Sequence, residues 1–201
     1  MFILKSKLKN NFIVRWILAV LDIKKFIGII HYPAYLNQFR RYRQVEKSYT
    51  VKIRDSHPCL SDCTETTPFD PHYFYQAAWL ARELALHRPE QHVDIGSHVL
   101  MIAVLSGFIQ TSFIDYRPLD IQIKGLDCRA GDITNLNLPS NSVHSLSCLH
   151  VIEHIGLGRY GDRLDPTGSY IAAKELIRIL APDGRLYISL PTGKERVCFN
   201  A

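Results

Sequence analysis

QHVDIGSHVLMIAVLSG, residues 91–107, predicts a short buried strand that turns sharply into a helix. The run from His92 to Ile95 is rich in β-branched residues and ends at Gly96. Beyond it, apolar or small residues recur at helical spacing, at Leu100, Ala103, Val104, Gly107 and Phe108. A strand that enters a helix through a glycine turn begins a βαβ unit, and the free N–H groups of that helix form an anion site. We therefore expect a nucleotide-like cofactor above this turn.

Further strand and helix signals lie on both sides of this stretch. A helix is expected up to His87, with Asp70 as its N-cap and Pro71 as its first residue. A second helix carries apolar residues at 173, 176, 177 and 180 and closes at Pro-Asp-Gly, 182–184. Four more strands are expected at residues 111–116, 125–128, 143–150 and 185–190. The alternation predicts an α/β fold with a doubly wound, mostly parallel, Rossmann-like sheet.

Charge divides the chain into a basic front part and a mildly acidic remainder. Residues 1–53 hold 11 Lys/Arg and 2 Asp/Glu, whereas the remaining residues hold 13 and 17 of the chain's 24 and 19. We therefore expect a basic helical arm and loop over residues 1–67 and the α/β domain over residues 68–201. A basic arm suggests contact with a phosphate-bearing surface.

Two interpretations of the arm stay open. Residues 13, 16, 17, 20 and 21 form one apolar helical face, but the uncharged run from Trp16 to Leu21 is too short to span a bilayer. The helix either packs on the domain or lies on an anionic membrane surface, assisted by Arg40, Arg41 and Arg43. No nucleic-acid role is expected from the sequence, because it contains no base-reading motif.

The cysteines favour a reducing compartment. The chain has 5 of them, an odd number, and most lie in apolar, strand-like runs. Cys59 and Cys63 lie near His57, but a zinc site needs four ligands, so no metal is expected. These observations predict a cytoplasmic protein, membrane-associated if the arm binds lipid.

Polar residues gather where the carboxyl ends of the parallel strands should meet. The candidates are Gly96, Ser97, Asp115, Asp132 and the segment 150–154. Asp115 lies 21 positions after Asp94, the separation at which an acidic side chain accepts hydrogen bonds from both ribose hydroxyls. The alternative roles are a helix cap or turn for Asp115 and an Asx turn for Asp132.

Longer blocks of sequence resemble a known superfamily. Residues 131–155, GDITNLNLPSNSVHSLSCLHVIEHI, and 175–191, ELIRILAPDGRLYISLP, are similar to the second half of class I S-adenosylmethionine-dependent methyltransferases. Residues 72–97, DYRPLD at 115–120, CLHVIEHIGLGRYGD at 148–162 and GKERVCFNA at 193–201 more closely resemble an uncharacterised family of that superfamily, domain of unknown function 268. The resemblance covers residues 69–201 and leaves the basic arm outside it.

The resemblance implies a role for each matching position. S-adenosylmethionine would be the cofactor, with its ribose hydroxyls at Asp115 and its adenine at Asp132 and Ile133. Its methionine part would lie beside Asp94, Gly96 and Ser97. His150 would lie under the sulfonium and face the methyl acceptor.

The acceptor is expected to be a small molecule or a glycan. His150 or His154 could remove its proton, with Glu153 orienting an imidazole; alternatively, Glu153 and His154 only cap the following loop. Arg159 and Tyr160 could hold an anionic or sugar acceptor, or form an exposed turn.

Three departures from the superfamily pattern keep a non-catalytic alternative open. Only Gly96 remains of the usual glycine run, which argues against NAD or FAD; His144 replaces a common Asp; and the sequence stops after the fifth strand, where two more are usual. A truncated domain, or a methyltransferase-like binding module without activity, would also show these features. His150, Glu153 and His154 also spell the H-x-x-E-H zinc protease motif, but Gly156 and Gly158 interrupt the helix that it needs.

Overall fold

The computed structural model describes residues 29–194, 197 and 199. The chain divides into two compact units, Met1–Pro68 and Phe69–Ala201. The apolar face expected around Trp16 lies outside the described residues. In the part that is described, no helix has the length and apolar character needed to cross a membrane.

The described part of the first unit, residues 29–68, contains helical elements with no buried residue. Its described elements are a 3-10 turn η1 (Ile29–His31), the helix α4 (Tyr32–Val45) and a second turn η2 (Ile53–Asp55). None of the residues in these elements is buried. The described part of this unit therefore presents almost all of its side chains to its surroundings.

The second unit is built on a five-stranded parallel sheet in the order β3-β2-β1-β4-β5. Its strands are β1 (Gln91–Ile95), β2 (Gln110–Asp115), β3 (Leu126–Ala130), β4 (Val143–Leu149) and β5 (Leu180–Ser189). After β3 the chain crosses back over β2 and β1 to add β4 on the other side. The centre of the sheet, between β1 and β4, is therefore the point where the winding direction changes.

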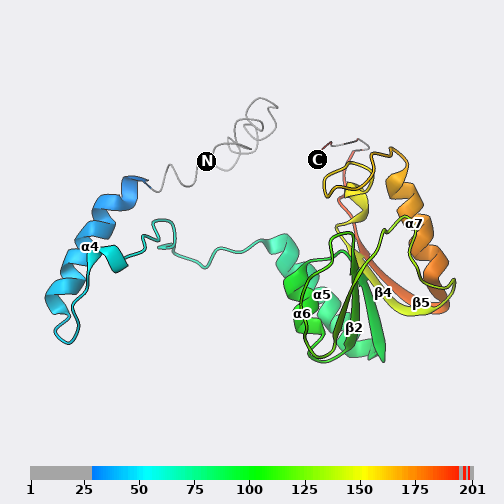
Figure 1. The fold of residues 1–201 in the computed structure, drawn as a ribbon, viewed down its shortest axis with the longest axis horizontal. Helices are drawn as coiled ribbons and strands as arrows, with labels where there is room; N and C mark the ends of the chain where they lie inside the picture. The colour runs from blue at the N-terminus through cyan, green and yellow to red at the C-terminus, as the bar shows by residue number, and fades with distance from the viewer. Residues whose placement is uncertain (1–28, 195–196, 198, 200–201) are drawn as a thin grey trace. The chain divides into compact units, whose positions relative to one another are not determined.

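Helices cover both faces of this sheet (Figure 1), with α5 (Pro71–His87) and α6 (Val99–Leu105) on one face and α7 (Gly168–Ile179) on the other. Asp70 caps α5 by accepting from the N–H groups of His72 and Tyr73 at 2.9 and 3.4 Å, as the sequence predicts. The doubly wound α/β fold is confirmed.

Two separate cores form, one on each face. The α7 side includes Ile95, Ile114, Leu146, Leu176 and Ile179. The side covered by α5 and α6 includes Leu80, Leu84, Ile102, Leu105 and Phe113. Burial on both faces holds the strand ends in fixed positions above which a site can form.

The structure corrects several details of the expected elements. The face of α6 expected from Leu100 and Val104 is exposed, at 69% and 68%, and Met101, Ile102 and Leu105 are buried instead. No helix lies between β2 and β3 or between β3 and β4, so strands and helices alternate in only part of this unit. Pairing of the last strand begins at Leu180 opposite Val143, with an irregularity before Arg185 pairs with Ser145.

Candidate functional site

A pocket of about 580 Å³ lies above the carboxyl ends of β1, β2 and β4. Its lining includes Gly96, Ser97, Asp115, Asp132, Ile133 and His150 of the residues expected from the sequence, together with Tyr160 from the loop after β4. A pocket of this size lies within the range of small-molecule and cofactor sites. Most of the candidate residues proposed from the sequence therefore line the same pocket.

Gly96 forms the sharp turn after β1. Its φ is +68°, and its N–H donates to the carbonyl of Ile114 at 2.9 Å. A Cβ at this position would lie 3.2 Å from Cγ1 of Val151 and 3.5 Å from Oδ2 of Asp115. The backbone conformation thus favours glycine, an added Cβ would crowd Val151, and the turn faces the acidic tip of β2.

Asp94 lies beneath the pocket rather than in its lining. It is 0% exposed, and its Oδ1 accepts from the N–H of Ser97 at 3.0 Å. The hydroxyl of Ser97 in turn accepts from the N–H of Leu149 at 3.0 Å, so the ends of β1 and β4 are tied together. Burial raises the pKa of Asp94 from its ordinary 3.8 to about 6. Asp94 therefore shapes the turn at Gly96 and Ser97 that lines the pocket.

His92 extends this buried network, a role that the sequence pattern does not indicate. Its Nδ1 and Nε2 lie 2.8 Å from the hydroxyls of Ser145 and Ser147, and Ser147 also donates to Oδ2 of Asp94. Burial lowers the pKa of His92 from 6.5 to about 4. The buried His92 ring is consequently neutral at physiological pH.

Asp115 and Asp132 both take part in turns at the pocket wall. Oδ1 of Asp115 accepts from the N–H of Arg117 at 2.7 Å, while Oδ2 points toward Gly96. Asp132 accepts from the N–H and hydroxyl of Thr134 at 2.8 and 2.6 Å, which is the Asx turn considered from the sequence. The Oδ2 atom of Asp115 is the one directed toward the pocket.

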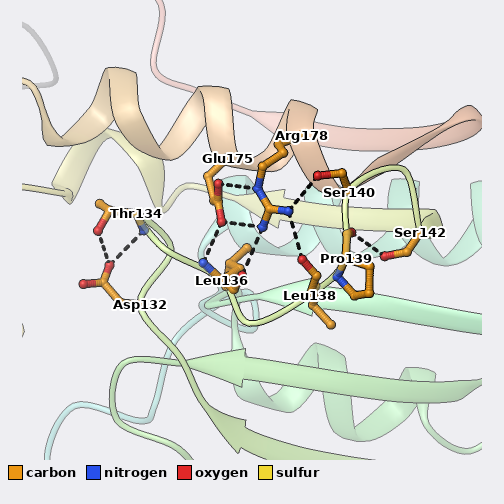
Figure 2. A network of polar contacts seen from close by, with 9 residues as sticks. All are labelled: Asp132, Thr134, Leu136, Leu138, Pro139, Ser140, Ser142, Glu175 and Arg178. Atoms are coloured by element: carbon orange, nitrogen blue, oxygen red, sulfur yellow. Dashed lines mark hydrogen bonds and ion pairs between the residues drawn. The ribbon is translucent and has the colours of Figure 1, made fainter.

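A clamp from α7 holds the β3–β4 connection that carries Asp132 (Figure 2). The guanidinium of Arg178 donates to the carbonyls of Leu136 and Leu138, both at 3.0 Å. Glu175 pairs with Arg178 at 2.7 Å and accepts from the N–H of Leu136 at 2.7 Å. The long connection therefore has a fixed course without a helix of its own.

His150 occupies an unusual backbone position at the end of β4. Its φ is +55°, and its N–H donates to the carbonyl of Ser189 at 3.1 Å. Left-handed backbone at a non-glycine residue costs energy and is enriched at functional sites. Nδ1 of His150 lies 2.8 Å from Oε1 of Glu153, which is the contact that an orienting role for Glu153 requires.

His72, which the sequence analysis did not single out, contacts His150 from the first turn of α5. The two Nε2 atoms form a hydrogen bond, and the ring centroids are 4.0 Å apart. Sequence spacing cannot reveal a pair whose members are 78 positions apart. The available signal was a histidine opening the block at residues 72–97 that carries the family resemblance.

The loop after β4 is ordered by Asp162. This carboxylate accepts from the N–H groups of Gly156, Gly158 and Tyr160 at 2.9, 3.3 and 3.1 Å. The Tyr160 ring contacts two guanidinium groups, that of Arg117 at 4.5 Å and that of Arg159 at 5.3 Å from its centroid. Tyr160 lines the pocket, and so do Arg117 and Arg163, which the sequence analysis missed; Arg159 is not part of the lining.

The zinc protease geometry does not form at H-x-x-E-H. Residues 152–154 make a single 3-10 turn, and the two histidines have different partners. His150 contacts Glu153 and His72, whereas His154 lies against Tyr160 and Arg159. Among the described residues, no group of three metal-ligating side chains comes together. The protease alternative therefore lacks the helix and the ligand geometry that it requires.

The fold and the site together define a Rossmann-like α/β domain with a cofactor-type pocket at the point where the sheet changes direction. More narrowly, the chain belongs to the family described as "Caenorhabditis protein of unknown function, DUF268", whose sequence profile matches residues 98–201. No curated protein matches the chain.

Solved structures show similarity over part of the chain. YcgJ from Bacillus subtilis aligns with a TM-score of 0.45 and 16% identity, covering 57% of this chain and 50% of YcgJ. A chain of the complex between the Haloferax volcanii Trm112 methyltransferase activator and the putative methyltransferase aligns with a TM-score of 0.39 and 16% identity. That alignment covers 61% of each chain.

Proposed function

We propose that the second unit binds S-adenosylmethionine in the pocket above the sheet and transfers its methyl group to a small-molecule or glycan acceptor. One observation carries the proposal. The glycine turn after β1 faces the carboxylate that ends β2, with only 3.5 Å between an added Cβ on Gly96 and Oδ2 of Asp115. Such an arrangement suits a ribose whose hydroxyls donate to the carboxylate.

The residues present fit the parts of the cofactor. Oδ2 of Asp115 would hold the ribose, and the buried Ile133 would contact the adenine. The turn at Gly96 and Ser97 would hold the methionine part, and His150 would face the sulfonium side of the pocket. The single glycine is sufficient for a ligand without phosphate, because no pyrophosphate needs to approach the backbone closely.

When bound, the cofactor supplies a methyl group that its positive sulfur already activates. The protein then needs to align the acceptor, exclude water and receive a proton. Tyr160 and Arg163 line the wall of the pocket that the loop after β4 supplies, where they could contact an acceptor with anionic or hydroxyl groups. The unpaired Cys59, Cys63, Cys128 and Cys148 agree with a reducing, cytoplasmic setting, which we also propose.

Calorimetric titration of the full chain with S-adenosylhomocysteine tests the proposal. We expect saturable binding, and we expect Asp115→Asn to weaken it roughly ten-fold, about 1.4 kcal/mol, because one charge-assisted acceptor is lost. Asp127→Asn is the matched control, since Asp127 lies on the neighbouring strand, bonded to Arg129 and outside the pocket lining. Absence of binding by the wild type would contradict the proposal.

A binding module without methyl transfer is the second candidate. Both ring nitrogens of His150 are already occupied, by Glu153 and by His72, so this imidazole has no nitrogen ready to receive a proton. Saturable cofactor binding without methylation of any compound in an extract treated with labelled S-adenosylmethionine would favour this candidate. Incorporation of label that Asp115→Asn abolishes would favour the enzyme.

A further inference from the structure

A second hollow of about 650 Å³ lies beside the cofactor-type pocket, between the start of α5 and the end of β5. Its walls include His72, Tyr75, Gln76, Trp79 and Ser189. We call it the α5 groove. The groove and the cofactor-type pocket meet at a hydrogen-bonded pair, because His72 lines the first and His150 lines the second.

Glu153, His150 and His72 form one continuous hydrogen-bonded chain. With Glu153 as a carboxylate, Nδ1–H of His150 donates to Oε1 at 2.8 Å, which leaves the lone pair of His150 on Nε2. That nitrogen accepts from Nε2–H of His72. In a neutral His72 the lone pair is then on Nδ1, the nitrogen that this chain leaves available.

The other walls of the α5 groove combine aromatic faces with polar atoms. Tyr75 is 65% exposed and Trp79 39% exposed, and the Trp79 ring is braced by an edge contact with Tyr187 at 5.9 Å. The side-chain oxygen of Gln76 accepts from the hydroxyl of Ser189 at 3.1 Å, and the Gln76 NH₂ group takes no part in this hydrogen bond. Aromatic faces beside hydrogen-bonding groups suit a flat or puckered ring that carries hydroxyls.

We propose that the α5 groove binds a hydroxyl-bearing ring compound, whose hydroxyl donates a hydrogen bond to Nδ1 of His72 while its ring packs on Tyr75 and Trp79. This binding is separate from the proposed methyl transfer, because the α5 groove does not depend on the cofactor. His150 and Glu153 act here as positioning residues, because they fix which nitrogen of His72 carries the lone pair.

Two probes with the same ring, one with a hydroxyl proton and one with a methoxy group in its place, test the binding. Phenol and anisole are titrated into the full chain, with ring-proton NMR of Tyr75 and Trp79 as the readout and methyl glucoside as the sugar counterpart of phenol. We expect phenol or the glucoside to bind more tightly than anisole by roughly five-fold, the worth of about one hydrogen bond. Tighter binding by the glucoside would identify a sugar ring, and tighter binding by phenol an aromatic one.

Variants separate this inference from the proposed function. His72→Phe keeps a ring but should remove the preference for phenol over anisole, whereas His87→Phe, at the other end of α5, should retain it. Asp115→Asn should lose affinity for S-adenosylhomocysteine and still bind phenol in the α5 groove. Equal binding of phenol and anisole by the wild type would overturn the inference even if the cofactor binds.

The tautomer of His72 gives an independent readout. Long-range proton–nitrogen NMR spectra distinguish the two neutral forms of a histidine ring. We expect His72 to carry its proton on Nε2 in the wild type and to lose this single tautomer in Glu153→Ala. A proton on Nδ1 of His72 in the folded wild type would contradict the proposed chain.

Discussion

Single residues decide whether the pocket exists, and Gly96 is the clearest case. Its φ of +68° would strain any other residue, and an added Cβ would enter the space between Val151 and Asp115. Gly161 has a φ of +87° but nothing within 4 Å of an added Cβ. Substitutions at these two positions therefore distinguish the effect of backbone strain from the effect of an added side chain in the pocket.

We predict that Gly96→Ala and Gly161→Ala each lower the free energy of unfolding by about 1 kcal/mol because alanine resists this conformation. Only Gly96→Ala should also weaken binding of S-adenosylhomocysteine, by roughly ten-fold, about 1.4 kcal/mol. Urea denaturation and calorimetric titration measure the two effects. Equal affinities in the two variants would show that the ligand does not approach the turn.

The buried network gives a prediction about pH. Burial raises the pKa of Asp94 from 3.8 to about 6. Between these pH values the folded state binds more protons than the unfolded state, so the contribution of Asp94 to stability falls as pH rises. Burial lowers the pKa of His92 from 6.5 to about 4. Between these pH values the unfolded state binds more protons than the folded state, so the contribution of His92 to stability rises as pH rises. Each effect amounts to about 3 kcal/mol across its range.

We therefore expect Asp94→Asn and His92→Gln to tilt the pH dependence of stability in opposite directions. Relative to the wild type, the free energy of unfolding of Asp94→Asn should rise from about pH 4 to 6, and that of His92→Gln should fall. Urea denaturation at about pH 4, 5, 6 and 7 measures both. Tilts of the same sign would mean that one of the two groups does not titrate as its burial implies.

At the scale of elements, the sequence predicted the features that depend on neighbouring residues and on periodic patterns. Strands β1, β2 and β4, the Asp70 cap of α5 and the turn at Gly96 follow from apolar runs and turn residues, and parallel strand ends then bring Gly96 and Asp115 together. The His72–His150 contact could not be predicted, because it depends on where α5 docks on the sheet. The buried face of α6 was also missed, since a helix of only seven residues carries little periodic signal.

The β3–β4 connection shows an element fixed by side chains instead of periodicity. Arg178 on α7 reaches the carbonyls of Leu136 and Leu138 and pairs with Glu175 (Figure 2). This connection also carries Ile133, which lines the pocket. The clamp therefore couples the order of α7 to the adenine side of the proposed site.

We predict that Arg178→Lys lowers the free energy of unfolding, because one ammonium nitrogen cannot reach all the acceptors that the separate nitrogens of the guanidinium now bind. Hydrogen exchange should increase across residues 131–142. Arg129→Lys is the control, since Arg129 bonds only the neighbouring Asp127 in the described part of the chain. Unchanged exchange in 131–142 would show that the clamp does not order the connection.

At the scale of the whole molecule, the two units differ in charge and in packing. Residues 1–53 hold 11 Lys/Arg and 2 Asp/Glu, and no acidic residue lies between Ile29 and Val45. α4 has no buried residue and combines Tyr32, Tyr42 and neighbouring aromatics with three arginines. Aromatic and cationic side chains on one unburied helix suit the interface of an anionic membrane, which we propose as the partner of this unit.

We predict that the full chain cosediments with vesicles containing phosphatidylserine and not with vesicles of phosphatidylcholine alone, because the attraction is mainly electrostatic. Each arginine near an anionic surface contributes about 1 kcal/mol, so replacing all three with glutamine should weaken partitioning by roughly 100-fold. These residues are Arg40, Arg41 and Arg43. A matched variant removes three exposed charges from the second unit, at Lys124, Lys174 and Arg185, and should bind like the wild type. Equal binding to both kinds of vesicle would show that the charges of α4 do not drive membrane binding. Binding to RNA but not to vesicles would show that the partner of the basic arm is a nucleic acid.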